Sequence, residues 1–222
     1  MPQNSHAPAR ALTAFARLLA RLLLQLTVRG AERVPLSGGV LLTMNHLGGA
    51  DPVLVLSFCP RPPLVAGKVE ILSWPIVGLV VRAYGMIPLH RGHANADRAA
   101  LVRVLASLAA GEALLIAPEG RESHTGALEA GQGGAAFLAQ HAAGIPIVPV
   151  ALTGTAWKDI LPAWRRLRRP CVTLTFGPPY RLTGGLRRQA AVDEIMSHIA
   201  ALLPAEFRGV YAGKPIEMGK VD

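Results

Sequence analysis

The chain has 222 residues, of which 51% are hydrophobic but only 5% aromatic, and its 23 Lys and Arg residues outnumber its 14 Asp and Glu residues. This length fits one domain with a single core, and the net charge of +9 favours partners that carry phosphate or an anionic surface. Few aromatic side chains are available to stack on bases, and neither zinc-ligand spacing nor a helix-turn-helix signal occurs, so anionic lipid is favoured over nucleic acid. The two cysteines, Cys59 and Cys171, indicate no disulfide framework or zinc cluster, which fits a reducing, cytosol-facing compartment.

Residues 1–30 contain an apolar stretch that predicts an amphipathic helix over residues 11–28. At 100° per residue, most of its leucines and Phe15 fall on one face, and Arg17 and Arg21 fall on the other. Each arginine would cost roughly 2.5–3.5 kcal/mol at the centre of a bilayer, so we expect no membrane span, and the same charges argue against a cleaved signal peptide. Two interpretations stay open. The helix lies in the membrane surface with its arginines toward anionic lipid, which would make the chain a peripheral protein on the cytoplasmic face of the cell membrane, or it packs its leucines on the core.

The remaining chain alternates between strand-length and helix-length segments. Short apolar runs predict strands at 40–44, 64–66, 86–89, 113–117, 145–152 and 172–176. Helix-length stretches lie at 52–59, 69–83, 96–110, 129–142 and 189–203. This alternation predicts a single α/β domain over 31–204, with a mostly parallel central sheet flanked by helices, followed by a polar tail over 205–222. The two prolines in the run at 145–152 suggest that this strand is an edge strand or carries a bulge.

The segment that connects the first of these strands to the following helix carries the clearest chemistry. It reads TMNHLGGADP over residues 43–52, so His46 and Asp51 are five residues apart with Gly48 and Gly49 between them. A turn through the glycines can bring the carboxylate to the imidazole. The carboxylate would fix the tautomer and leave the other ring nitrogen free to take a proton from a hydroxyl. The competing interpretation is structural, because Asp followed by Pro is also typical of a helix start.

Two further strand ends carry charged residues. The run GMIPLHRG at 85–92 delivers Arg91 to a strand end, where ligands gather in open α/β sheets and a guanidinium suits an anionic group. The run LLIAPEGRES at 114–123 ends in Glu119, Gly120 and Arg121, and Gly120 permits close approach of the backbone to a ligand. A solvated surface arginine and an ordinary charged turn are the alternatives for these two segments.

In this order and at this spacing, the blocks resemble the lysophosphatidate (1-acylglycerol-3-phosphate) acyltransferase family. The similarity is carried by N-H-x4-D at 45–51, G-x-I-x-x-x-R at 85–91, P-E-G at 118–120 with an arginine beside it, and V-P-V at 148–150. Lesser similarities are the lysine and glutamate of VAGKVE at 65–70 and the strand end FGPP at 176–179. H-x4-D alone is a weak signal, but H-x4-D followed by P-E-G at this interval is specific.

The resemblance implies an O-acyltransferase that moves a fatty acyl group from acyl-CoA or acyl carrier protein to the hydroxyl of a lysophosphatidate-like acceptor, with no metal or organic cofactor. His46 would be the general base and Asp51 its orienting partner, and the hydroxyl would attack directly without an acyl-enzyme. The implied substrate-binding residues are Asn45, Lys68, Arg91, Glu119, Gly120 and Arg121. The chain departs from the family pattern where Arg121 follows Gly120 with no threonine between them, and where Leu47 and two glycines follow the histidine.

Other functions remain open at this stage. An acyltransferase of the same fold could act on another lysolipid, an ornithine lipid or a glycolipid, and the motifs do not separate these acceptors. A catalytically silent protein could bind anionic membranes through the N-terminal helix and the Arg-rich loop at 164–169. A serine hydrolase is disfavoured because no G-x-S-x-G sequence occurs.

Overall fold

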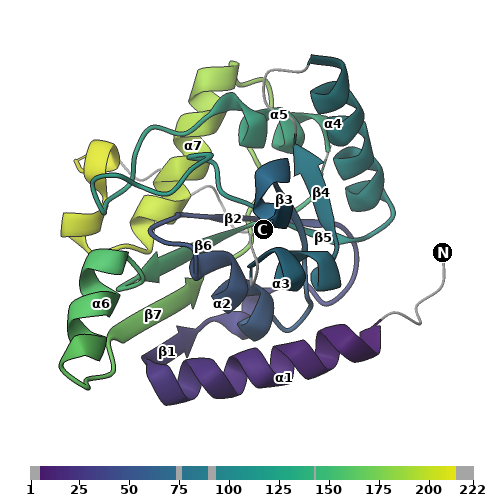
Figure 1. Ribbon diagram of the computed structural model, residues 1–222. Helices are drawn as coiled ribbons and strands as arrows, with labels where there is room; N and C mark the ends of the chain where they lie inside the picture. The colour runs from purple at the N-terminus through teal and green to yellow at the C-terminus, as the bar shows by residue number, and fades with distance from the viewer. Residues whose placement is uncertain (1–5, 74–76, 90–93, 143, 214–222) are drawn as a thin grey trace.

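The chain folds around one mostly parallel sheet. The computed structural model describes residues 6–73, 77–89, 94–142 and 144–213, and in these residues seven strands pair in the order β1-β7-β6-β2-β5-β3-β4 (Figure 1). The strands are β1 Gln25–Arg29, β2 Val40–Met44, β3 Leu64–Lys68, β4 Met86–Leu89, β5 Ala113–Ile116, β6 Ile147–Thr153 and β7 Cys171–Phe176. From β6 to β4 all neighbours are parallel, whereas β7 is antiparallel to β6 and β1 is parallel to β7. The predicted α/β fold is confirmed.

Helices cover both faces of the sheet. They are α1 His6–Leu23, α2 Asp51–Phe58, α3 Val77–Tyr84, α4 Ala94–Ala109, α5 Gly133–His141, α6 Trp157–Arg165 and α7 Arg188–Ala201, with 3-10 turns η1 Ala31–Arg33, η2 Val69–Ser73, η3 Ala205–Phe207 and η4 Gly209–Tyr211. The central strand β2 is buried along its whole length: Leu41 packs with α4, α5 and α7, while Leu42 packs on the opposite face with α1 and α2. A strand that is buried on both faces consists of consecutive apolar residues, and for this reason β2 could be predicted from the sequence. Of the described helices, none has the length and apolar character that crossing a bilayer requires.

The N-terminal helix lies earlier in the chain than predicted, over His6–Leu23. The expected helix over 11–28 ends at Leu23, and Gln25–Arg29 forms β1 instead, paired with β7 from Gln25↔Cys171 to Arg29↔Thr175. Leu26 and Val28 alternate with more exposed neighbours, a period-two pattern that belongs to a strand. The sheet therefore begins before residue 31, where the sequence suggested that the domain starts.

The orientation of α1 supports core packing for only part of the predicted apolar face: Leu12 packs on the core, whereas most of the other apolar side chains do not. Phe15, Leu18 and Leu22 point outward, with 57–61% of each residue exposed. Arg17 faces the protein, donates to the backbone oxygen of Ser57 and lies over the Phe58 ring. Arg17 on the protein side, with Phe15, Leu18 and Leu22 outside, reverses the usual arrangement of a surface helix in water over this part of α1.

Three other expectations need correction. The predicted helix at 69–83 is divided into η2 and α3 in the described residues, and α6 was not predicted at all. The segment 205–211, expected in a polar tail, forms η3 and η4, and its Tyr211 is buried in the core. The strand with two prolines is not an edge strand, because β6 lies between β7 and β2.

The alternative expectation, a bulge in the strand that holds the prolines, is not met either, because the extra residue lies in the partner segment. Val150 faces Phe176 and Ile147 faces Tyr180, so three steps along β6 match four along the segment after β7. The carbonyl oxygen of Pro149 accepts the N–H of Gly177 at 2.8 Å. Proline is tolerated at such a place because the ladder is already interrupted there.

Candidate active site

His46 and Asp51 meet at the carboxyl end of β2. The loop 45–50 folds back so that the Oδ2 atom of Asp51, the first residue of α2, lies 3.0 Å from Nδ1 of His46. Oδ2 also accepts the backbone N–H groups of Leu47 at 2.6 Å and Gly48 at 2.9 Å. The carboxylate is buried and is held by the loop that carries the histidine. It makes no capping hydrogen bond to α2, so the interpretation of Asp51 as a helix cap is not supported.

Gly48 allows this tight loop. A Cβ atom at residue 48 would lie 2.5 Å from the carbonyl oxygen of Thr155, which precedes α6. Any side chain would push the loop away from Thr155 and move the two N–H groups that orient Asp51. Gly48, one of the two glycines by which the chain departs from the family pattern, is therefore required by close packing.

Glu119 supports the histidine from the neighbouring strand. It follows β5, is almost fully buried, and its Oε1 accepts the backbone N–H of His46 at 3.1 Å. Its Oε2 accepts the N–H of Glu129 at 2.9 Å. Burial raises the pKa of Glu119 to about 7, although the two N–H groups oppose this shift. Both carboxylate oxygens of Glu119 are thus engaged by backbone N–H groups, and the residue positions the loop that carries His46.

Asn45 has a similar positioning role. Its Nδ2 donates to the carbonyl oxygen of Leu152 at 2.9 Å, and its Oδ1 accepts the N–H of Leu152 at 2.7 Å. The side chain is buried and fixes the end of β2 to the end of β6. The expectation that Asn45 contacts substrate is therefore replaced by a contact with the protein's own backbone.

The environment of His46 adjusts its proton affinity. Burial lowers the pKa of His46, but the hydrogen bond that Nδ1 donates to Asp51 and the charges of Asp51, Glu122 and Glu119 outweigh burial and raise this pKa above the ordinary value of 6.5. Because Nδ1 is engaged by Asp51, Nε2 is the ring nitrogen left for a reacting group. This arrangement can accept a proton from a hydroxyl and hold the resulting imidazolium beside a carboxylate.

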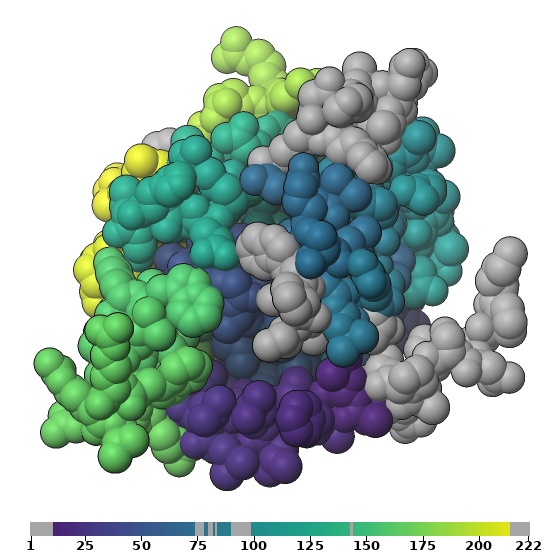
Figure 2. Space-filling view, in the orientation of Figure 1, coloured from purple at the N-terminus to yellow at the C-terminus, as the bar shows by residue number. Residues whose placement is uncertain are grey.

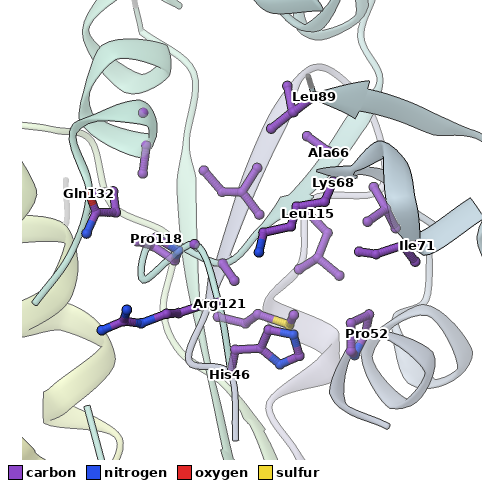
Figure 3. Close-up of a pocket in the computed structure, with 18 of the residues that line it drawn as sticks. His46, Pro52, Ala66, Lys68, Ile71, Leu89, Leu115, Pro118, Arg121 and Gln132 are labelled. Atoms are coloured by element: carbon purple, nitrogen blue, oxygen red, sulfur yellow. The ribbon is translucent and has the colours of Figure 1, made fainter. Parts of the chain in front are cut away.

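His46 lies at one end of a cavity of about 690 Å³. In Figure 3, His46 and Pro52 are at one end of the lining residues and Leu89 is at the other. The polar lining consists of His46, Lys68, Glu70, Arg121, Glu122 and Gln132. The apolar lining comes from β3, β4, β5, α4 and α5 and includes Val65, Ala66, Leu89, Leu101, Val104, Ile116 and Leu138. The cavity therefore joins a proton acceptor to an apolar compartment.

The three predicted cationic residues differ in their placement. Lys68, at the end of β3, extends into the cavity (Figure 3). Arg121 lines the cavity, but its guanidinium donates to Oε2 of Glu129 at 2.9 and 3.2 Å and points away from His46 (Figure 3). Gly120 lines the cavity beside it. Arg91 lies outside the described residues.

Two site residues were not predicted. Glu122 lines the cavity and acts on the charge state of His46. The position of Glu122 next to Arg121, a predicted site residue, was the signal in the sequence that could have identified it. Glu129 accepts the N–H of His124 at 2.7 Å and pairs with Arg121, thereby closing the loop that carries Glu119. No pattern in the sequence marked this residue. Among the described residues, no three His, Cys, Asp or Glu side chains group as a metal site.

Comparisons with known proteins identify the family of the chain. A model of the Acyltransferase family matches residues 25–153. A 1-acyl-sn-glycerol-3-phosphate acyltransferase from Borreliella burgdorferi is 26% identical over 132 residues, which cover 60% of this chain and 52% of that protein. The chloroplastic 1-acyl-sn-glycerol-3-phosphate acyltransferase BAT2 of Brassica napus is 28% identical over 129 residues, covering 58% of this chain and 37% of that protein. The matched part is thus about half of the bacterial relative.

The crystal structure of the 1-acyl-sn-glycerophosphate (LPA) acyltransferase PlsC from Thermotoga maritima has a similar fold. It aligns with a TM-score of 0.63 and 20% identity over 84% of this chain and 76% of that one.

Proposed function

The chain belongs to the Acyltransferase family, and from this we propose that it transfers a fatty acyl group from acyl-CoA or acyl carrier protein to the hydroxyl of a lysophosphatidate-like acceptor. The observation that carries the proposal is the 3.0 Å contact between His46 and Asp51 at the end of a cavity with an apolar wall. A hydroxyl, a thioester carbonyl and an acyl chain could be held there together.

In the proposed reaction, Nε2 of His46 takes the proton of the acceptor hydroxyl as its oxygen attacks the thioester carbonyl. The tetrahedral intermediate collapses, the new C–O ester bond remains and the C–S bond breaks. The imidazolium returns the proton to the departing thiolate, so the thiol leaves and His46 is neutral again. Asp51 stabilises the imidazolium in between. The thioester supplies an activated acyl group, so the reaction needs no resident metal or organic cofactor.

Separate parts of the cavity suit the two substrates. The apolar wall formed by β3, β4, β5, α4 and α5 is suited to the acyl chain, because burying each CH2 group contributes about 0.8 kcal/mol. We propose that Lys68 and Arg91 bind the phosphate of the acceptor, and that Arg121 does so only when it leaves Glu129. The backbone of Gly120 lines the same part of the cavity.

The exposed apolar side of α1 supports peripheral contact with a membrane, which we place at the cytoplasmic face of the cell membrane. Phe15, Leu18 and Leu22 would enter the boundary between headgroups and acyl chains. The sequence suggested that the arginines of this helix face the lipid. Arg17 instead contacts Ser57 and Phe58, so the apolar side is the one offered to the bilayer.

The test uses the full chain with a long-chain acyl thioester and a panel of lysolipid acceptors, in detergent, with thiol release and lipid product both measured. His46→Ala should reduce transfer by about 10²- to 10⁴-fold, the usual contribution of a positioned general base. Circular dichroism should show an unchanged fold. Near-normal transfer by folded His46→Ala would exclude the mechanism. Transfer to another lysolipid, an ornithine lipid or a glycolipid would change the acceptor class alone. Failure of the wild type with every acceptor would favour a silent membrane-binding protein.

A further inference from the structure

The end of α1 and the end of α6 are fixed to each other. Nε1 of Trp164, in the last turn of α6, donates to the backbone oxygen of Leu23 at 3.2 Å. Arg169, in the loop after α6, donates to the backbone oxygens of Arg21 and Leu24. The two helices are far apart in sequence but lie side by side at this corner of the molecule (Figure 1).

Both helices carry large exposed apolar side chains. At 100° per residue, Trp157, Leu161 and Trp164 share one side of α6, and they are 50%, 43% and 37% exposed. We use the term "apolar face" for these three residues together with Phe15, Leu18 and Leu22 of α1. Exposed large apolar side chains gathered in this way are typical of a site that binds a partner or a membrane.

The loop after α6 presents a leucine at a position that favours glycine. The N–H of Leu167 bonds to the carbonyl of Trp164, and that of Arg168 bonds to the carbonyl of Ala163, which is the Schellman pattern at the end of a helix. Leu167 accordingly has φ +54°, the left-handed conformation that glycine adopts without steric cost. Its side chain is 98% exposed. The fold gains nothing from a leucine here.

Charge identifies the partner. Arg165, Arg166 and Arg168 surround Leu167, all three are exposed, and the described segment 160–171 contains no acidic residue. The one acidic residue of α6, Asp159, lies on the side of the helix away from the apolar face. An apolar tip ringed by arginines matches the surface of an anionic bilayer, where headgroup phosphates lie above acyl chains.

We propose that α6 and its Leu167 loop are a second membrane-docking element, continuous with α1, and that Leu167 and Trp164 insert while the surrounding arginines contact anionic headgroups. The proposal extends the peripheral contact of α1 proposed above and rests on it. Two anchors joined at one corner would fix the orientation of the domain on the bilayer as well as its attachment.

This orientation brings the surface close to the catalytic loop. α6 begins directly after Thr155, whose carbonyl oxygen packs against Gly48. In the space-filling view, α6 and α1 lie on the same side of the molecule as the hollow between the segments near residues 120 and 70 (Figure 2). A lipid acceptor in the bilayer would thus reach the site from the edge that α6 defines.

The first experiment measures binding of the full chain to phosphatidylcholine vesicles with and without phosphatidylglycerol, without substrate. Leu167→Asn should weaken binding about tenfold, as expected for a partly inserted leucine. Its unfolding temperature should be unchanged or higher, since asparagine tolerates the left-handed conformation. Leu36→Asn is the matched control, because Leu36 is 74% exposed in the loop before β2 and off the apolar face. Equal effects of the two substitutions would overturn the proposal.

A second measurement separates a bilayer from a protein partner. Arg165→Gln with Arg168→Gln should weaken binding about tenfold or more on vesicles with phosphatidylglycerol, and little on phosphatidylcholine alone. Sedimentation without lipid should give a monomer. A dimer that Leu167→Asn dissociates would overturn the proposal in favour of a second copy of the chain. A chain that binds vesicles as described but transfers no acyl group would leave this inference standing and overturn the proposed function.

Discussion

The carboxylate of Glu119 accepts the backbone N–H of His46 at 3.1 Å, so the segment after β5 holds the histidine that follows β2. The same carboxylate accepts the N–H of Glu129 with its other oxygen at 2.9 Å. Two strand ends and a distant loop are thereby joined through one buried side chain.

Glu119→Gln should lower both stability and activity. Glutamine has a single acceptor oxygen, so one of the two buried N–H groups loses its partner, at a cost of about 1–3 kcal/mol in the free energy of unfolding. We expect kcat/KM to fall about tenfold because the loop of His46 is displaced. Glu122→Gln is the matched control: it removes a neighbouring charge that bonds no backbone group around His46. Urea unfolding and steady-state kinetics are measured for both variants. Equal losses in the free energy of unfolding would contradict the positioning role of Glu119.

Asp51→Asn should reduce activity far more than stability. The amide oxygen can still accept from Leu47 and Gly48, but the amide nitrogen would replace Oδ1, a buried atom without a partner, at a cost of about 1–3 kcal/mol. The imidazolium loses its carboxylate, so transfer should fall by about 10²- to 10⁴-fold. The rate of thiol release, measured by stopped-flow or at steady state, is compared with the thermal unfolding temperature of the same samples. A variant with normal turnover would reduce Asp51 to a structural residue.

The pH profile of kcat/KM should have an acid limb above pH 6.5. His46 acts only when neutral, and its pKa is raised above the ordinary 6.5, so activity is absent at low pH and rises through that raised value. Glu119, with a pKa of about 7, bonds both N–H groups best when ionised and therefore adds to the same limb. Asp51→Asn removes the main influence that raises the pKa of His46, so the residual activity should have its limb at lower pH. A limb that moves upward would contradict the pairing.

Arg91→Lys should impair transfer to acceptors with a phosphate monoester. A guanidinium binds phosphate through two hydrogen bonds, a geometry that lysine reproduces poorly, and a hydrogen bond to a charged group contributes roughly 1.5–3 kcal/mol. The loss in kcat/KM should be about tenfold to a hundredfold for lysophosphatidate and small for an acceptor without the monoester. Arg121→Ala should have a smaller effect, since its guanidinium is already paired with Glu129. Equal losses on both acceptors would mean that Arg91 does not bind the phosphate.

Gly134→Leu should shift the preference of the enzyme toward shorter acyl chains. Gly134 lines the cavity from α5, and a Cβ atom there would meet nothing within 4 Å, so the new side chain narrows the cavity without a clash. Gly134→Ala is the control, and both substitutions should stabilise the helix by up to about 1 kcal/mol. Relative kcat/KM values for a series of acyl chain lengths provide the measurement. A uniform decrease for all lengths would place the acyl chain elsewhere.

The strands and motif blocks could be predicted because their signals are local. Leu41 and Leu42 lie in an apolar run that a doubly covered strand requires, and His46 and Asp51 are separated by one short loop. Glu129 could not be predicted, since its contacts with Arg121 and His124 depend on how a ten-residue loop closes. Strand β1 was missed because its leucine and valine extend the apolar pattern of α1, and only pairing with β7 makes the segment a strand.

The edge strand β1 pairs with a segment 146 residues later in the chain. During synthesis β1 therefore cannot pair before β7 has been made. Closing so large a loop also has a high entropic cost, so this edge is among the last parts of the sheet to form. α1 is made before both and is separated from β1 by Leu24 alone. A nascent chain thus exposes its apolar helix well before the sheet edge and α6 are complete, so the proposed contact of α1 with a membrane would be available while the domain is still folding.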